Sequence, residues 1–329
     1  MRPFSYVRAE DAITASQSIG AGSAFLAGGT TLLDLMKLDV MRPETLVDIN
    51  SLRGSAPAVA LTQGGLRLSA FASMAETAAD PNIEHDYPII AQSLALAASP
   101  QLRNMATLGG NVLQRTRCNY FRNPSWRACN KREPGSGCAA LDGVNRKHAV
   151  LGVSPHCIAS YAGDFAQALI ALDAAVETIG PAGPRVIKFE ALHRTPGDTP
   201  QTETNLGQGE LITAFIVPRA PWTRRSLYLK IRDRESYEFA LASAAVALDI
   251  EGDAVKQARI ALGGIATRPW RAHAAEQALA GKPLDEDTAN HASQLALAHA
   301  SARQGNAFKV ELARRTLRRA LLQAASMKV

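Results

Sequence analysis

The tract Leu26-Ala27-Gly28-Gly29-Thr30-Thr31-Leu32-Leu33-Asp34 lies near the start of the chain, ahead of an apolar helical pattern. Its two glycines have no side chain and can adopt a positive φ, so the tract predicts a loop. Backbone N–H groups exposed in such a loop can hold a pyrophosphate. A second tract, Thr107-Leu108-Gly109-Gly110-Asn111, has the same chemistry with a side-chain amide added. Two tracts of matching design predict one shared anionic ligand.

The pattern around the first tract predicts a small αβ unit that ends near residue 55. A second mixed unit follows it. Pro218-Arg219-Ala220-Pro221 predicts the end of that unit, because prolines interrupt both helix and sheet hydrogen bonding. We therefore expect a first domain over residues 1–219, with subdomains of about 1–55 and 56–219, and a second domain over 220–329.

Apolar periodicity predicts secondary structure in both domains. The expected strands cover residues 46–50, 65–71, 175–179, 211–217, 227–230, 244–250 and 259–262. The expected helices include 88–98, 165–173 and 308–325. Residues 115–157 show little periodicity and are rich in Arg, Lys, Asn, Pro and Gly, which predicts a long insertion that needs something to order it.

Composition favours a globular protein of two or three units. The chain has 329 residues, of which 47% are hydrophobic and 20% charged. No apolar stretch approaches the ~20 residues that a membrane-spanning helix needs, so membrane insertion is not expected. The net charge of +6 would suit an anionic partner or cofactor, although an ordinary basic surface explains it equally well. The first residues show no apolar segment with a small-residue cleavage site behind it, so we expect no export signal on this chain.

Several well-known catalytic motifs are missing from the sequence. The tract Gly20-Ala21-Gly22-Ser23-Ala24-Phe25 begins like a dinucleotide fingerprint but lacks the third glycine, so a nicotinamide site is not expected. There is no Walker A lysine after a glycine loop, and HExxH, GxSxG and CxxC are absent as well. These absences argue against kinase and hydrolase functions.

All four cysteines of the chain, Cys118, Cys129, Cys138 and Cys157, fall within the predicted insertion. Their spacing matches neither a zinc finger nor a ferredoxin. Many Arg and Lys residues surround them, and nearby cations favour the thiolate that binds metal. The residues leave four readings open, namely a 4Fe-4S cluster, structural zinc, two disulfides, or unrelated thiols. His156, next to Cys157, either hydrogen-bonds a cluster sulfur or has only a packing role.

Together these tracts resemble the FAD-binding medium subunits of the xanthine dehydrogenase and carbon monoxide dehydrogenase family, over nearly the whole chain. Two further stretches contribute to the resemblance, Asp164-Phe165-Ala166-Gln167-Ala168-Leu169-Ile170-Ala171-Leu172-Asp173 and Leu262-Gly263-Gly264-Ile265-Ala266. It implies an α+β fold. An FAD-binding domain of the vanillyl-alcohol oxidase (PCMH) type, in two subdomains, is followed by an α+β domain like the carbon monoxide dehydrogenase flavoprotein C-terminal domain.

The insertion resembles one found in the FAD subunits of bacterial periplasmic aldehyde oxidoreductases, where it carries a 4Fe-4S cluster. The similar stretches are Leu113-Gln114-Arg115-Thr116-Arg117-Cys118, Cys129-Asn130-Lys131-Arg132, Pro134-Gly135-Ser136-Gly137-Cys138-Ala139-Ala140-Leu141 and His148-Ala149-Val150. Most members of the wider family lack this insertion. The resemblance implies that Cys118, Cys129, Cys138 and Cys157 bind the cluster.

The resemblance also implies which residues bind FAD. Backbone N–H groups of Ala27 to Leu33 would hold the pyrophosphate, and Asp164 would lie by the flavin or its ribityl chain. Ile212 and Lys230 would lie beside the isoalloxazine, where Lys230 stabilises negative charge on the reduced ring. The full set is Leu26, Ala27, Gly28, Gly29, Thr30, Thr31, Leu32, Leu33, Thr107, Gly110, Asn111, Asp164, Ile212 and Lys230.

The function implied is that of an electron-transfer flavoprotein subunit of a heterotrimeric molybdenum hydroxylase that oxidises aldehydes. A large partner subunit would carry the molybdenum cofactor, a small one two 2Fe-2S clusters, and an external acceptor would take the electrons. This chain would contribute no catalytic residue to the oxidation of the aldehyde. Two other interpretations are a free-standing flavin oxidoreductase of the same fold and a zinc-stapled protein that binds nucleic acid, but we expect no nucleic-acid partner.

The resemblance implies a periplasmic location by co-export with a signal-bearing partner, whereas this chain alone looks cytoplasmic.

Overall fold

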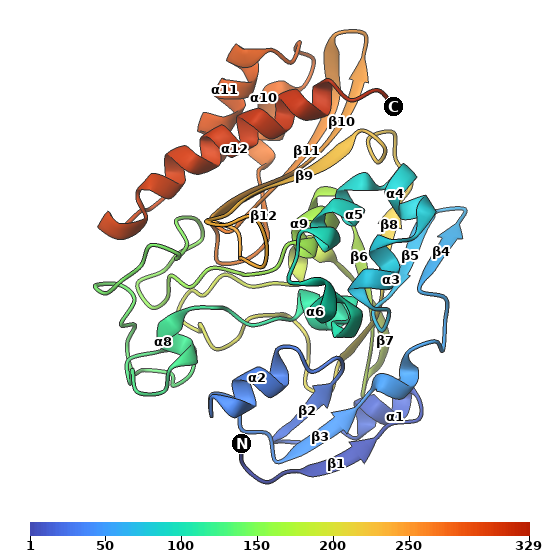
Figure 1. Cartoon of the computed structure of the whole chain (residues 1–329), viewed down its shortest axis with the longest axis vertical. Helices are drawn as coiled ribbons and strands as arrows, with labels where there is room; N and C mark the ends of the chain where they lie inside the picture. Colours follow the sequence, from blue (N-terminus) through green and yellow to red (C-terminus); the bar gives the residue numbers. More distant parts are fainter.

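The computed structural model describes residues 1–329 and contains three sheets that follow one another along the chain (Figure 1). The first is a parallel three-stranded sheet of order β1-β3-β2, which lies at the N-terminal end of the molecule. Its strands are β1 (Ser5–Arg8), β2 (Ser23–Leu26) and β3 (Thr45–Asp48). The helices around it are α1 (Ala12–Gln17), α2 (Leu32–Lys37) and the 3-10 turn η1 (Asn50–Leu52).

The second sheet is antiparallel, with five strands in the order β4-β5-β8-β6-β7. Its strands are β4 (Val59–Thr62), β5 (Gly65–Ser69), β6 (Ala175–Gly180), β7 (Gly183–Lys188) and β8 (Leu211–Pro218). The elements that connect them are α3 (Met74–Ala78), α4 (Pro81–Asp86), α5 (Pro88–Ala95), α6 (Pro100–Met105), α7 (Leu108–Val112), α8 (Asn119–Arg122), α9 (Phe165–Ala171) and η2 (Phe189–Ala191).

Local sequence signals fix where several of these helices begin. Asp80 caps α4 and Ser99 caps α6, each by accepting hydrogen bonds from backbone N–H groups of the first turn. Each cap is followed by a proline, whose fixed φ suits the first helical position and whose missing N–H would have no partner there. The helices are short and lead the chain back towards the first sheet.

The third sheet is antiparallel and has the order β12-β11-β10-β9. Its strands are β9 (Ser226–Ile231), β10 (Ala242–Glu251), β11 (Ala254–Gly263) and β12 (Trp270–Arg271). The chain ends with α10 (His273–Leu279), α11 (Glu286–Ala296), η3 (Gln304–Asn306) and α12 (Phe308–Ala325). Figure 1 shows these helices along one face of the sheet, at the opposite end of the molecule from the first sheet. No helix in the chain is both long and apolar enough to span a membrane.

Strand β10 is buried on both faces, because it packs against two different cores. Ala244, Val246 and Leu248 belong to the core of the C-terminal helices. Ala245 and Ala247 alternate with them and belong to the core of the second sheet, as expected from the two-residue period of a strand. The third sheet therefore shares a core with the residues before Pro218, although the prolines separate the two units along the sequence.

The insertion, residues 115–157, contains only one short helix, α8, and otherwise consists of turns and loops. It is ordered partly by hydrogen bonds from side chains to backbone. Arg132 donates to the carbonyls of Tyr120 (2.7 Å) and Phe121 (2.9 Å). At the end of the insertion, Leu151 forms a parallel bridge with Ala266. The insertion is thereby tied to the third sheet.

Lys309, in the first turn of α12, is fully buried and holds the insertion against the C-terminal domain. Its Nζ donates to the carbonyls of Gly264 (2.7 Å) and His148 (3.1 Å). Burial, with a smaller contribution from the nearby cations Arg146 and Lys147, lowers the pKa of Lys309 to about 7. An unfolded lysine keeps its ordinary pKa of 10.5.

This difference predicts a pH effect on stability. Between pH 7 and about 10.5 the unfolded chain binds the proton at Lys309 and the folded chain does not, so raising the pH favours folding. We expect wild type to gain stability relative to Lys309→Met across this range, by at most about 1.4 kcal/mol per pH unit. Denaturant unfolding at several pH values measures it, with Lys188→Met at an exposed position as the control. A pH-independent difference between wild type and Lys309→Met would contradict the assignment.

Candidate cofactor site

The first glycine tract forms the loop between β2 and α2. The N–H groups of residues 27–32 donate no hydrogen bond within the chain, which leaves six consecutive donors free. Gly29 has φ +71°, a conformation that side chains disfavour. A Cβ on Gly28 would lie 1.9 Å from the carbonyl oxygen of Met105, so only glycine allows the loop to approach that backbone. The loop is therefore built to present its N–H groups to an acceptor outside the chain.

The second tract is different, because it forms the short helix α7 instead of an open turn. Its N–H groups are already used: Leu108 donates to Ala72, Gly109 to Ala70, and both Gly110 and Asn111 to Thr107. The prediction of two matching tracts is therefore wrong in this respect. The glycines of the second tract have no side chains and so allow a close approach to its backbone. The tract also contributes the side chains of Thr107 and Asn111.

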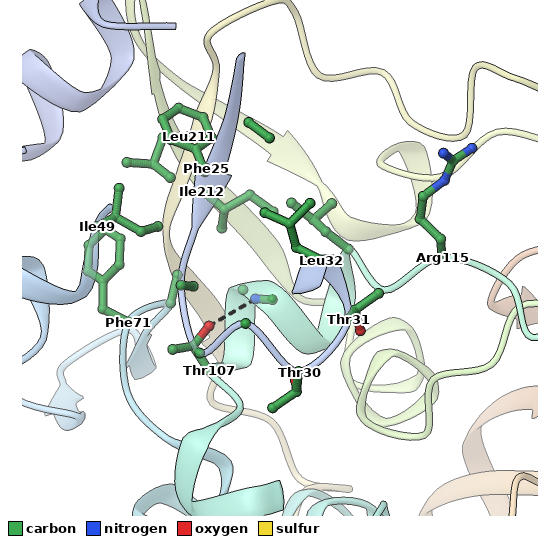
Figure 2. Close-up of a pocket in the computed structure, with 18 of the residues that line it drawn as sticks. Phe25, Thr30, Thr31, Leu32, Ile49, Phe71, Thr107, Arg115, Leu211 and Ile212 are labelled. Atoms are coloured by element: carbon green, nitrogen blue, oxygen red, sulfur yellow. Dashed lines mark hydrogen bonds between the residues drawn. The ribbon is translucent and has the colours of Figure 1, made fainter. Parts of the chain in front are cut away.

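A largely apolar cavity of about 230 Å³ opens beside the first loop (Figure 2). In the close-up, apolar side chains gather on one side and the three threonines Thr30, Thr31 and Thr107 on the other. The apolar side chains are Phe25, Ile49, Phe71, Leu211 and Ile212. We call this space the apolar cavity, and its flat, apolar walls suit an aromatic ring.

A larger cavity of about 460 Å³ lies on the other side of the same loop. We call it the polar cavity, and it shares Thr30, Thr31 and Gly110 with the apolar cavity. Asn111 lines it, and the side-chain oxygen of Asn111 is buried without any hydrogen-bond partner. Asn111 thus offers a hydrogen-bond acceptor that no group of the chain uses. The two cavities meet at the loop with the free donors.

The polar cavity ends at a buried ion pair. Asp164 accepts hydrogen bonds from Lys230 Nζ (2.7 Å) and from the hydroxyl of Tyr228 (2.6 Å). Burial raises the pKa of Asp164 and is opposed by Lys230 and Tyr228. The Lys230 side chain is only 1% exposed and also donates to the carbonyl of Leu96 at 3.0 Å. Its charge is therefore already compensated by a carboxylate before any ligand binds.

The structure separates the predicted cofactor-binding residues into three groups. One group lines the apolar cavity: Ala27, Gly28, Gly29, Leu32, Thr107 and Ile212. Another lines the polar cavity: Asn111, Asp164 and Lys230. Thr30, Thr31 and Gly110 line both, whereas Leu26 and Leu33 line neither. Ile212 and Lys230 line different cavities, and whether both flank the same ring stays a prediction.

The sequence reasoning missed the arginines that reach these cavities from the insertion. Arg115 lines the apolar cavity, and Arg117 and Arg122 line the polar one. Both Arg117 and Arg122 pair with Asp34 in α2, at 3.3 and 2.8 Å. In the sequence these arginines had been assigned only to the charge around the cysteines. Their position three to ten residues after the end of α7 was a signal that they could reach the second tract's ligand.

The four cysteines have free thiols, and three of them, Cys118, Cys129 and Cys138, belong to or pack against two small apolar clusters. Cys118 packs against both clusters, and Cys129 and Cys138 are neighbours in an antiparallel bridge. Burial raises the pKa of Cys118 to about 12 and that of Cys157 to about 11, with Lys131 partly opposing the second shift. The expectation that surrounding cations lower these two thiol pKa values is therefore wrong. No group of three or more His, Cys, Asp or Glu side chains is arranged to hold a metal ion.

Lys131 lowers the pKa of Cys157, but burial outweighs this effect, and the cations also form ion pairs with carboxylates. Lys131 and Arg115 both pair with Glu203, at 2.7 and 2.6 Å. His156, the histidine singled out in the sequence, lies half-exposed 3.3 Å from Asp198. The histidine that contacts a cysteine is His148, whose Nε2 lies 3.1 Å from Cys118 Sγ.

Comparison with known proteins identifies the ligand. Residues 2–220 match the family described as the FAD binding domain in molybdopterin dehydrogenase. Residues 227–324 match the carbon monoxide dehydrogenase flavoprotein C-terminal domain. The chain belongs to the FAD-binding medium subunits of the xanthine and carbon monoxide dehydrogenase family. It is thus an FAD-binding oxidoreductase subunit of the molybdenum hydroxylase type, and its fold is the predicted one.

Individual relatives cover almost the whole chain. The aldehyde oxidoreductase FAD-binding subunit PaoB of Escherichia coli is 45% identical over 98% of this chain and 99% of its own. The carbon monoxide dehydrogenase medium chain of Afipia carboxidovorans is 28% identical over 95% and 93%. Among solved structures, carbon monoxide dehydrogenase from Hydrogenophaga pseudoflava aligns with a TM-score of 0.75 and 26% identity, covering 98% of this chain and 97% of the other.

Proposed function

We propose that this chain is the FAD-binding electron-transfer subunit of a heterotrimeric, molybdenum-containing aldehyde oxidoreductase. The observation that carries the proposal is the 45% identity with PaoB, which extends over both chains almost from end to end. In this proposal a large subunit holds the molybdenum cofactor and oxidises the aldehyde. A small subunit with two 2Fe-2S clusters passes the electrons to this chain, and an external acceptor removes them.

The residues of the two cavities support one arrangement of FAD. The apolar cavity suits the adenine, and the free N–H groups of residues 27–32 suit the pyrophosphate. The polar cavity suits the isoalloxazine, because the unpaired Asn111 oxygen can accept a hydrogen bond from the ring's N–H. In this arrangement Ile212 contacts the adenine, whereas Lys230 and Asp164 lie near the flavin. When bound, FAD supplies the ability to accept and release electrons singly or in pairs.

We further propose that the four cysteines hold a 4Fe-4S cluster. The donor set is four free thiols, the ligand set of such clusters. Because Cys118 and Cys157 have raised pKa values, cluster binding must release protons from them.

The visible spectrum of the anaerobically purified chain, with flavin and iron measured on the same sample, tests both cofactors. Flavin bands near ~450 nm with about four irons per chain are the expected result. Flavin without iron would contradict the proposed 4Fe-4S cluster and leave zinc or disulfides as the explanations for the cysteines. A sample that stays colourless after addition of FAD would overturn the flavin site.

Replacement of a single cysteine separates the two cofactors. We expect Cys129→Ser to lose most of its iron and keep its FAD, because Cys129 lies among the thiols but lines neither cavity. Iron and flavin contents of the purified variant measure this. Ser125→Ala, at an exposed position in the same insertion, is the control and should keep both. Unchanged iron in Cys129→Ser would exclude it as a ligand.

Isolation from the native host distinguishes the proposal from a free-standing flavin oxidoreductase. Two further chains should co-purify with this one, and aldehyde should bleach the flavin only in their presence.

For location we propose the periplasm, reached by co-export with a signal-bearing partner. Recovery of the complex in the cytoplasmic fraction alone would contradict that location and leave the oxidoreductase function unaffected.

A further inference from the structure

The insertion contributes a cation to the wall of the polar cavity. Arg117 immediately precedes Cys118, and its side chain is mostly buried, 26% exposed. One guanidinium nitrogen lies 3.3 Å from Asp34 Oδ2, and another lies 3.5 Å from the hydroxyl of Thr31. Its Nε is buried without any hydrogen-bond partner. Arg117 lines the polar cavity, and its guanidinium lies beside Thr31, at the point where that cavity meets the glycine loop.

The charges at this point do not cancel. Asp34 is the only carboxylate that pairs with Arg117, and it also pairs with Arg122 at 2.8 Å. Two guanidinium groups and one carboxylate leave one positive charge next to Thr30 and Thr31. The acidic side chain of Asp34 would otherwise repel an anion from the loop, and the two arginines reverse that effect.

The guanidinium of Arg117 stacks on the ring of Phe239, which also lines the polar cavity, with the guanidinium carbon 5.0 Å from the ring centroid. Such stacking restricts the orientation of the planar guanidinium. A fixed guanidinium suits a phosphate, because charge-assisted hydrogen bonds to phosphate oxygens are about twice as strong as neutral ones. The glycine loop beside it has six free N–H donors for the same ligand.

We propose that Arg117 binds the pyrophosphate of FAD, so that the cysteine-containing insertion forms part of the flavin site. The proposal rests on the arrangement of FAD given above. It does not need the iron–sulfur cluster to be present, because every contact named here comes from the chain itself. It assigns to the insertion a second role besides that of the cysteines.

Comparing ligands with and without phosphate tests the proposal on the full chain freed of its flavin. Arg117→Met should bind FAD about 10- to 100-fold more weakly than wild type, as expected for loss of a hydrogen bond between charged groups. Its affinity for riboflavin, which has no phosphate, should not change. FAD binding by the variant should also depend less on salt concentration. Arg117→Lys, which keeps the charge but not the planar fork, should recover part of the FAD affinity.

Arg146→Met is the matched control, because Arg146 belongs to the same insertion and pairs with Asp233 at 2.8 Å but lines neither of the two cavities. It should bind FAD like wild type. Unchanged FAD affinity in Arg117→Met would overturn the proposal. A parallel loss of FAD and riboflavin affinity would also overturn it, because Arg117 would then act only by ordering the loop. Failure of wild type to bind FAD would instead refute the proposed function.

Discussion

Alanine at position 28 is expected to abolish retention of FAD. The added Cβ would lie 1.9 Å from the carbonyl oxygen of Met105 and 2.7 Å from its carbonyl carbon. Both are backbone atoms that cannot rotate away, so the glycine loop or the end of α6 must shift. Overpacking of this kind costs about 1–3 kcal/mol of folding stability. The same shift moves the N–H donors of residues 27–32 away from the pyrophosphate, so we expect Gly28→Ala to purify without flavin.

Flavin content and denaturant unfolding of Gly28→Ala measure the two effects separately. Gly20→Ala is the control, because a Cβ at Gly20 has only Ser23 Oγ nearby, at 4.0 Å. It should keep its flavin and its stability to within about 0.5 kcal/mol. If Gly28→Ala retains wild-type flavin, the close approach of the loop to α6 is not what positions the phosphate donors.

Lys230→Met is expected to be the most destabilising single change at the site. It leaves the carboxylate of Asp164 buried with only the hydroxyl of Tyr228 as a partner, and removes the hydrogen bond to the carbonyl of Leu96. Breaking a buried ion pair from one side costs about 3–5 kcal/mol. Because Asp164 and Lys230 line the polar cavity, FAD affinity should fall as well. Denaturant unfolding with and without FAD measures both quantities.

The double variant Asp164→Asn with Lys230→Met should recover a large part of the lost stability, because neither charge is then left alone in the interior. Lys256→Met is the matched surface control. Lys256 pairs with Glu251 at 3.3 Å, but both side chains are exposed, so its loss should cost less than about 1 kcal/mol. A small effect of Lys230→Met, equal to that of the surface control, would show that the ion pair does not hold the end of the cavity.

The buried pair also changes what Lys230 can do for the flavin. The resemblance implied a lysine whose charge stabilises the reduced ring. In the structure that charge is shared with Asp164 at 2.7 Å, so the ring would meet a nearly neutral, strongly oriented pair. Lys230 and Asp164 together form a fixed dipole at the end of the cavity. We therefore expect any effect of Lys230 on a bound flavin to depend on Asp164, so that replacing either residue alone would change more than one charge.

Local patterns were sufficient to predict most of the secondary structure. Helix α12 spans Phe308–Ala325, as predicted from its leucines, and β6 and β8 lie where alternation placed them. The loop conformation of the first glycine tract was also predicted correctly. The conformation of the second tract was not predicted correctly, because Thr107 caps a helical turn there and both glycines lie within that turn. A pair of glycines is compatible with both an open loop and a short helix, and the cap decides between them.

The candidate site was predictable only in part. The sequence indicated the glycine tracts, the cysteines and, through the family resemblance, Asp164 and Lys230. It did not indicate that Arg117 reaches Asp34, which lies 83 positions away in the chain. It also pointed to His156, whereas His148 is the histidine that contacts Cys118. Contacts of this kind depend on the path of the insertion, which has no periodicity from which a path could be inferred.

The sequence by itself determined the loop at Gly28 and Gly29, many of the strands and helices, and the family, because each depends on residues close together in the chain or on a long shared pattern. Only the tertiary structure decided which backbone N–H groups remain free, which cavity each site residue lines, and which carboxylate neutralises each cation. The physical reason is that hydrogen-bond satisfaction and charge balance depend on every group within a few ångströms, whatever its position in the chain.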